Sequence, residues 1–280
     1  MSSGTLYVVA TPIGNLDDLS IRASKTLAAC DAVLAEDTRR TRQLLSHLGI
    51  SKPLRTLNAH ADARLIASLA REVIEGASFA LVSDAGTPLV SDPGAELVRE
   101  VIALSGRVVA IPGASAVLCA LAASGLAANA FRFVGFLPRS GGERAEVIAR
   151  TSETAEPVVL FEAGNRVRET IVELSTRTPE RLVAIGRELT KLHEEILRGT
   201  LAELAEQLAE RDEALLGEVT IVLGAHVPAA GAIDDAAIDA KIDEALRAGR
   251  GAKETSDIVA AMSGRPRREM YARVLGRKGR

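Results

Sequence analysis

Short apolar runs rich in Val, Leu and Ile alternate with stretches of helical spacing along most of the chain. In the first half, these runs are Thr5–Ala10, Ala32–Ala35, Phe79–Ser83 and Arg107–Ile111, each bounded by turn residues. Near-continuous apolar strands separated by helices are typical of a parallel sheet that is covered on both faces. The alternation therefore predicts an α/β fold.

A second α/β series follows a break of small residues at Gly125–Asn129. Its predicted strands are Phe131–Phe136, Pro157–Phe161, Leu182–Arg187 and Glu218–Leu223, with an additional short strand at Glu194–Leu197. A linker containing Pro and Gly lies at residues 228–231. We therefore expect an α/β domain over residues 1–125, a second α/β domain over 126–230, and a tail over 231–280.

The tail has no strand pattern and contains three short helical patterns, at Ile233–Leu246, Ala252–Met262 and Pro266–Leu275. Short helices joined by turns that contain Gly resemble a helix-turn-helix unit. From Arg247 to Arg280 there are ten Lys and Arg residues but three Asp and Glu residues, so this segment carries +7, whereas the whole chain carries −3. Contact with nucleic acid and a solvated helical cap both fit this pattern.

Composition excludes several classes of protein. The apolar runs are far shorter than the ~20 residues of a membrane helix, and the N-terminus has no signal-peptide pattern. We therefore expect a cytoplasmic protein with no membrane partner. The four His residues lack metal-ligand spacing and the two Cys residues lie in Ala- and Leu-rich surroundings, so no metal site or disulfide is expected. Aromatic residues make up 2% of the chain, which argues against a nucleic-acid surface built on stacking.

Small and polar residues gather directly after predicted strands, where open parallel sheets bind their ligands. The four loops concerned span residues 10–16, 35–42, 83–94 and 111–116. Their Pro and Gly residues suit sharp turns that expose the backbone to a ligand. Each loop taken singly also fits a tight turn or a helix cap, with Asp92 and Ser115 as capping residues.

Taken together, the order and spacing of these loops resemble the tetrapyrrole-methylase superfamily. The runs that carry the resemblance are ATPIGNL at residues 10–16, EDTR at 36–39, VSDAGTP at 82–88, IPGAS at 111–115, FVGFLP at 133–138 and LFEA at 160–163. Within that superfamily, the chain is similar to the ribosomal RNA small subunit methyltransferase I group over nearly its whole length, including the tail.

The resemblance implies a homodimer of two-domain α/β subunits that bind S-adenosylmethionine in the cleft between the domains. It also implies methylation of the 2′-hydroxyl of a cytidine ribose in the decoding region of 16S rRNA, so that the partner is this rRNA or the small ribosomal subunit. Carried onto this sequence, the cofactor-binding residues would be Pro12, Asp84, Ala85, Gly86, Thr87, Pro88, Gly113, Ala114, Ser115, Ala116, Leu137, Glu162, Ala163, Glu218 and Val219.

A ribose hydroxyl is a weak nucleophile that needs a base or a hydrogen-bond acceptor. The loop after the second predicted strand offers Asp37 or Glu36 for this task, with Arg39 orienting the acid or binding phosphate. Helix capping is the alternative explanation for these acids. The arginines expected to contact RNA are Arg22, Arg40 and Arg42 in the body, and Arg267, Arg268 and Arg273 in the tail.

Two other functions fit parts of the sequence. One keeps the fold and makes the chain a C-methylase of a corrinoid or uroporphyrinogen intermediate, a small substrate that requires neither the basic tail nor the cluster at Glu36–Arg39. The other is a non-enzymatic, nucleic-acid-binding regulator that uses the tail, with the body as a small-molecule sensor. Incorporation of a labelled methyl group into RNA separates both from the first interpretation.

Overall fold

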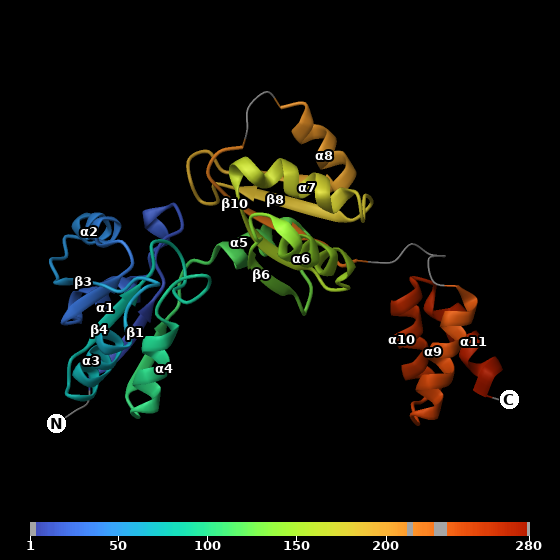
Figure 1. Cartoon of the computed structure of the whole chain (residues 1–280), viewed down its shortest axis with the longest axis horizontal. Coiled ribbons are helices and arrows are strands. Elements are labelled where there is room, and N and C mark those ends of the chain that lie inside the picture. The colour runs from blue at the N-terminus through green and yellow to red at the C-terminus, as the bar shows by residue number, and fades with distance from the viewer. Residues whose placement is uncertain (1–3, 212–214, 227–233, 279–280) are drawn as a thin grey trace.

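In the computed structural model, which describes residues 4–211, 215–226 and 234–278, the chain forms two five-stranded sheets and a group of three C-terminal helices (Figure 1). The first sheet is parallel throughout and the second is mixed. The α/β fold class predicted from the sequence is therefore confirmed.

The first sheet has the strand order β3-β2-β4-β1-β5. Its strands are β1 (Thr5–Val9), β2 (Ala32–Ala35), β3 (Leu54–Thr56), β4 (Phe79–Val82) and β5 (Arg107–Ile111). Its helices are α1 (Ile21–Ala29), α2 (Thr38–His47), α3 (Ala63–Ile74) and α4 (Ala95–Ala103), with a short 3-10 helix at Leu16–Asp18. The short edge strand β3 is not predicted from the sequence, because its three residues include the polar Arg55 and Thr56 and none is fully buried.

Successive residues of the central strands point to opposite faces of this sheet, as the period of a strand requires. Leu34 and Leu81 are fully buried against α3 and α4. Val33 and Val82 are buried on the other face, in the cluster that includes Leu27 of α1 and Leu45 of α2. Both faces are therefore covered, as the continuous apolar runs predict.

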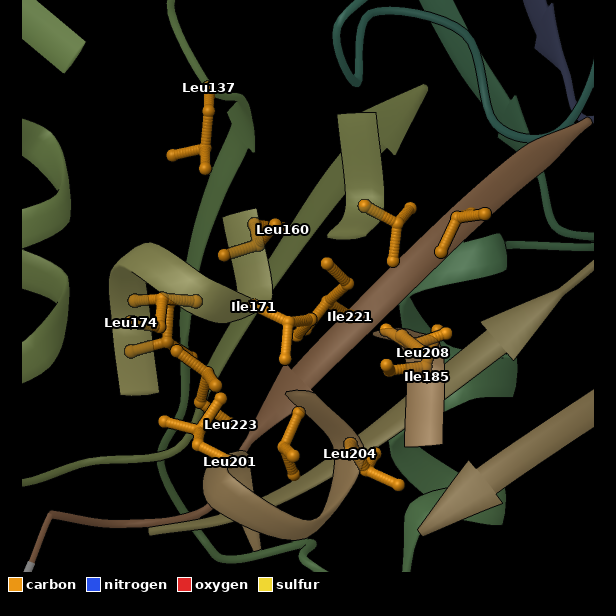
Figure 2. Close-up of a cluster of buried hydrophobic side chains, with 14 of the residues drawn as sticks. Leu137, Leu160, Ile171, Leu174, Ile185, Leu201, Leu204, Leu208, Ile221 and Leu223 are labelled. Carbon is orange, nitrogen blue, oxygen red and sulfur yellow. The ribbon is translucent and has the colours of Figure 1, made fainter. Parts of the chain in front are cut away.

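The second sheet has the strand order β6-β7-β10-β8-β9, in which only the β6–β7 pair is parallel. Its strands are β6 (Arg132–Phe136), β7 (Val158–Ala163), β8 (Leu182–Arg187), β9 (Glu195–Thr200) and β10 (Glu218–Leu223). The helices α6 (Gly141–Glu153), α7 (Val167–Ser175) and α8 (Leu201–Ala209) cover one face, and a 3-10 helix (Gly164–Arg166) precedes α7. Figure 2 shows Leu and Ile side chains of α7 and α8 gathered over β10.

The helix α5 (Ala116–Ser124) covers the opposite face of the second sheet. Its Val117, Ala120 and Leu121 belong to one buried cluster with residues of β7, β8 and β10. The helix α5 therefore packs on the second sheet, although it precedes the domain boundary that the sequence predicts after residue 125. The small-residue break marks the end of the helix, where Gly125 has a positive φ of 76°, and not the end of the first packing unit.

The tail forms three helices, α9 (Asp235–Arg247), α10 (Ala252–Ser263) and α11 (Arg267–Lys278). They share a small buried core of Ile238, Ile242, Val259, Met270 and Val274. The predicted helical tail is thus confirmed. The predicted domain boundary at residues 230/231 and the start of the first tail helix at residue 233 lie outside the described residues.

Candidate active site

A cavity of about 360 Å³ is lined by residues of both halves of the body. Of the predicted cofactor residues, Asp84, Ala85, Gly86, Thr87, Ser115, Ala116, Glu162, Ala163, Glu218 and Val219 line it. The lining also contains residues that the sequence does not single out as cofactor ligands: Ile13, Arg40, Val90, Ser91, Asp92, Val117, Phe136, Phe161, Leu189, Gly217 and Thr220. The structure therefore brings loops from the whole body to one cavity.

Backbone contacts hold the loops of the first sheet against one another at this cavity. Thr11 and Gly86 exchange two hydrogen bonds, of 2.9 and 3.1 Å, between their backbone N–H and C=O groups. The Thr87 hydroxyl donates to the carbonyl of Ala114 at 3.1 Å. Gly86 has a φ of 81°, and a Cβ there would lie 3.2 Å from Cγ2 of Ile13. This position therefore favours glycine for conformational and steric reasons.

Other predicted cofactor residues lie in these loops or behind them, outside the cavity lining. Pro88, Gly113 and Ala114 belong to the loops, and Pro12 lines a neighbouring hollow. A Cβ at Gly113 would lie 2.9 Å from Cβ of Ala10, so this glycine permits close packing of the loop on β1. Leu137 is 2% exposed and belongs to the core of the second sheet.

The Glu162 side chain is turned into the protein, where it holds two arginines. Its carboxylate accepts a hydrogen bond from the Thr170 hydroxyl at 2.8 Å and lies 3.6 Å from Arg144 and 3.3 Å from Arg166. The two arginines donate in turn to the carbonyl of Pro138 at 3.1 and 2.8 Å. This network fixes the chain that follows β6, next to Phe136 in the cavity wall.

Asp84 and Asp92 line the first-sheet side of the cavity, and Glu36, which does not line it, is close enough for its charge to act on Asp92. Burial raises the pKa of Asp92 to about 6, and repulsion by Glu36 and Asp84 adds to this rise against an opposing hydrogen bond from Ser83. The Asp84 carboxylate accepts from the backbone N–H of Asp37 at 3.1 Å and lies 3.5 Å from Arg40. Asp92 therefore changes charge near pH 6, close to neutral pH.

The Asp37 side chain caps a helix. Its carboxylate accepts from the backbone N–H of Arg39 at 2.8 Å at the start of α2, and pairs with the Arg39 guanidinium at 2.8 and 3.1 Å. These hydrogen bonds, those of the guanidinium first, lower the pKa of Asp37 to about 2. Neither Asp37 nor Arg39 is among the residues that line the cavity. The capping alternative thus describes the observed geometry of Asp37.

A second hollow of about 360 Å³ shares Ile13, Arg40, Asp84, Ala85 and Glu218 with the first cavity. Lys191 also lines it, 3.0 Å from Glu188 and 3.1 Å from Glu218. Sequence reasoning missed Lys191, because it lies in a turn without a motif. The local signal of that turn is conformational: Glu188 and Thr190 both have positive φ.

The arginines expected to contact RNA differ in how they are engaged. Arg22 and Arg42 are exposed, on α1 and α2, and Arg268 is exposed on α11. Arg267 pairs with Asp257, while Arg273 lies 2.7 Å from Asp239 and 3.0 Å from Asp235. Arg273 is therefore already paired within the tail.

The described parts of the chain contain no group of three or more His, Cys, Asp or Glu residues that could hold a metal ion. Within the same residues, no helix is long and apolar enough to cross a membrane.

Comparison with known proteins relates this site to a family. Residues 5–205 match the model of the tetrapyrrole (corrin/porphyrin) methylases. A ribosomal RNA small subunit methyltransferase I from Xylella fastidiosa is 42% identical over 96% of this chain and 98% of its own length. A protein of the same name from Neisseria meningitidis serogroup A is 38% identical over 99% of this chain and 95% of its own.

Solved structures share the fold at low identity. Uroporphyrin-III C-methyl transferase from Thermus thermophilus, complexed with S-adenyl homocysteine, has a TM-score of 0.54 at 20% identity and covers 79% of this chain and 97% of its own. Diphthine synthase has a TM-score of 0.61 at 16% identity and covers 80% of this chain and 92% of its own. From the matched residues and the two full-length relatives, the chain belongs to the tetrapyrrole methylase family and, within it, to the group of proteins named ribosomal RNA small subunit methyltransferase I.

Proposed function

We propose that the protein methylates the 2′-hydroxyl of a cytidine ribose in the decoding region of 16S rRNA, with S-adenosylmethionine as the methyl donor. The observation that carries the proposal is the extent of the similarity. The two relatives from Xylella fastidiosa and Neisseria meningitidis match 96% and 99% of this chain, so these matches include residues of the helical tail, while others of the same name match 79–80%. The uroporphyrin-III C-methyl transferase structure covers 79% of it.

The cavity suits S-adenosylmethionine in size and chemistry. Its volume of about 360 Å³ lies in the range of small-molecule sites. Phe136 is 60% exposed and lies 5.4 Å from Phe161, ring centroid to ring centroid, so the wall offers aromatic surface to a purine. Asp84 and Asp92 provide carboxylates to balance a cationic ligand. When bound, the cofactor supplies an electrophilic methyl group.

The protein's own task is to hold the ribose hydroxyl in line and to accept its proton. Asp92 suits the second role, because its carboxylate lines the cavity and has a pKa of about 6, so it is mostly ionised and still basic at neutral pH. A carboxylate with a pKa of about 2, such as that of Asp37, is a much weaker base. We therefore propose that Asp92 accepts the proton of the ribose hydroxyl. Asp37 and Arg39 instead shape the start of α2.

In this proposal, arginine side chains bind the RNA partner. Arg22, Arg40 and Arg42 would contact phosphates of the RNA, since Arg40 lines the cavity and Arg22 and Arg42 are exposed on α1 and α2, and the tail would add a second contact region. A ribosomal substrate implies a cytoplasmic location. We also retain the homodimer that the family resemblance implies, and sedimentation of the full chain tests it.

Incubation of the protein with methyl-labelled S-adenosylmethionine and either small ribosomal subunits or naked 16S rRNA tests this function. The expected result is label in the RNA, at a cytidine whose 3′ phosphodiester resists alkaline cleavage because its 2′-oxygen is methylated. Label on a base would refute 2′-O-methylation. Label in neither RNA, but in a corrinoid or uroporphyrinogen, would support the C-methylase alternative.

A further inference from the structure

An open hollow of about 740 Å³ lies at one end of the three-helix tail. Four basic residues line it: Arg247 at the end of α9, Arg250 in the following turn, and Arg277 and Lys278 at the end of α11. The other lining residues are Asp243, Leu246, Gly249 and Gly251. Residues from two separate segments thus form one cationic concavity.

The excess positive charge of the tail is concentrated in this hollow. With four cations and one carboxylate, its lining carries a formal charge of +3. The remaining residues of 234–280 contain seven Lys and Arg and seven Asp and Glu, so their charges balance. The segment-wide value of +7 counted from Arg247 overstates the basic character of the tail, since it leaves out the acids of α9.

Those acids neutralise the arginines along the side of the bundle. Asp235 and Asp239 pair with Arg273, and Asp235 also pairs with Arg265 at 2.7 Å. In the hollow itself, Asp243 pairs with Arg277 at 2.5 Å. In contrast, Lys278 has no hydrogen-bond or ion-pair partner among the described residues, and Arg247 donates only to the backbone carbonyl of Asp243, at 3.2 Å.

We propose that this hollow binds the phosphodiester backbone of the RNA substrate. The proposal rests on the proposed function, which supplies an RNA partner, and it names the contact surface of the tail. Multiple cations converging on an open concave surface suit a chain of phosphates, which they contact without reading the bases. No aromatic side chain is among the lining residues, so base stacking contributes nothing in the hollow.

The double variant Arg247→Gln/Lys278→Gln tests the proposal in the full-length protein. It removes two cations that have few internal partners and leaves the ion pairs of Arg277 intact. The matched control, Lys241→Gln/Lys253→Gln, removes two cations from α9 and α10 that do not line the hollow. Binding of a fluorescein-labelled single-stranded RNA oligonucleotide is measured by anisotropy over a range of salt concentrations, and thermal unfolding confirms that each variant is folded.

Loss of two phosphate contacts should reduce the slope of log K against log salt by about 1.4 and weaken binding about 25-fold at 0.1 M salt. The control pair should weaken binding less than about threefold. Equal weakening by both pairs would show that net charge alone matters, and no weakening by the hollow pair would show that the hollow does not bind RNA. Either result overturns the proposal.

Methyl transfer measured in parallel separates this proposal from the proposed function. If the wild type transfers no methyl group to 16S rRNA while the hollow pair alone loses RNA affinity, the proposed reaction fails and the hollow stands. If the wild type methylates the rRNA and the Arg247→Gln/Lys278→Gln variant binds RNA as tightly as the wild type, the proposed reaction is supported. The proposal that the hollow binds RNA is then refuted.

Discussion

Replacement of Asp92 by asparagine should reduce catalysis and stabilise the fold. The pKa of Asp92 is raised from 3.8 to about 6 by burial and by repulsion from neighbouring carboxylates. At about 1.4 kcal/mol per pH unit, the ionised carboxylate costs the folded state up to about 3 kcal/mol at neutral pH, less what solvent screens. Asparagine keeps the shape of the side chain and removes the charge.

The sign of the pH dependence follows from the raised pKa. Between about pH 4 and 6, the folded protein binds more protons at this group than the unfolded chain does, so stability decreases as the pH rises through that interval. The variant should therefore exceed the wild type in free energy of unfolding by about 1–3 kcal/mol at pH 8 and match it below pH 4. Urea unfolding at a series of pH values measures this difference.

Catalysis should respond in the opposite direction. Loss of a general base lowers kcat/KM by about 10²–10⁴-fold. In the wild type, kcat/KM should rise with pH through an apparent pKa near 6, since this parameter reports the free enzyme. Glu36→Gln should move that pKa downward, because Glu36 is one of the charges that raise it, whereas Asp37→Asn should leave it in place. A wild-type profile without this rise, or an Asp92→Asn variant with normal kcat/KM, would refute the assignment of the base.

Three further outcomes follow from the geometry. Glu162→Gln removes the fully buried carboxylate beside Arg166 and Arg144, of which Arg144 keeps a second partner in Glu173 at 3.0 Å, and it should lower the free energy of unfolding by about 3 kcal/mol in urea titrations; a change below 1 kcal/mol would contradict the network. Gly86→Ala places a methyl group 3.2 Å from Ile13 at a positive φ, and calorimetry should show at least tenfold weaker cofactor binding. Gly49→Ala, which has a positive φ but open space around it, should leave cofactor affinity unchanged. Deletion of residues 234–280 should leave cofactor affinity intact and weaken RNA binding, and equal RNA affinity of the two forms across salt concentrations would refute a role for the tail.

Much of the fold follows from local sequence patterns. The strands β1, β2, β4 and β5 are predicted within a residue or so, because each is an apolar run bounded by turn residues; β1, β2 and β4 are buried on both faces, whereas β5 lies at the sheet edge with only Ile111 buried. The loops that follow them converge on one cavity for a topological reason: parallel strands end at the same edge of a sheet. The wall provided by Phe136 and Phe161 is harder to predict, since it depends on how the second sheet faces those loops.

Electrostatic properties are the least predictable from sequence. Asp37, Asp92 and Ser115 all suit capping by sequence, and Asp37 and Ser115 do cap α2 and α5, but the N-cap of α4 is Gly94 and the prediction for Asp92 is wrong. The pKa values of Asp37 and Asp92 lie about four units apart. One carboxylate lies beside Arg39 and the other is half buried among acids. The charge of the tail illustrates the same limit, since Asp235 and Asp239 are distant in sequence from the arginine that they neutralise. Spatial neighbours, which local patterns do not encode, determine both outcomes.

The packing of α5 also bears on how the chain folds during translation. Its side chains are largely apolar, and they are buried only when strands as late as β10 have joined the second sheet. During translation, α5 therefore leaves the ribosome well before β10 has been synthesised. Until β10 joins the second sheet, the helix exposes an apolar surface. The first sheet has no such dependence in its buried clusters, so it can fold while the second is still being made. Truncated products that end between α5 and β10 should accordingly be the aggregation-prone species.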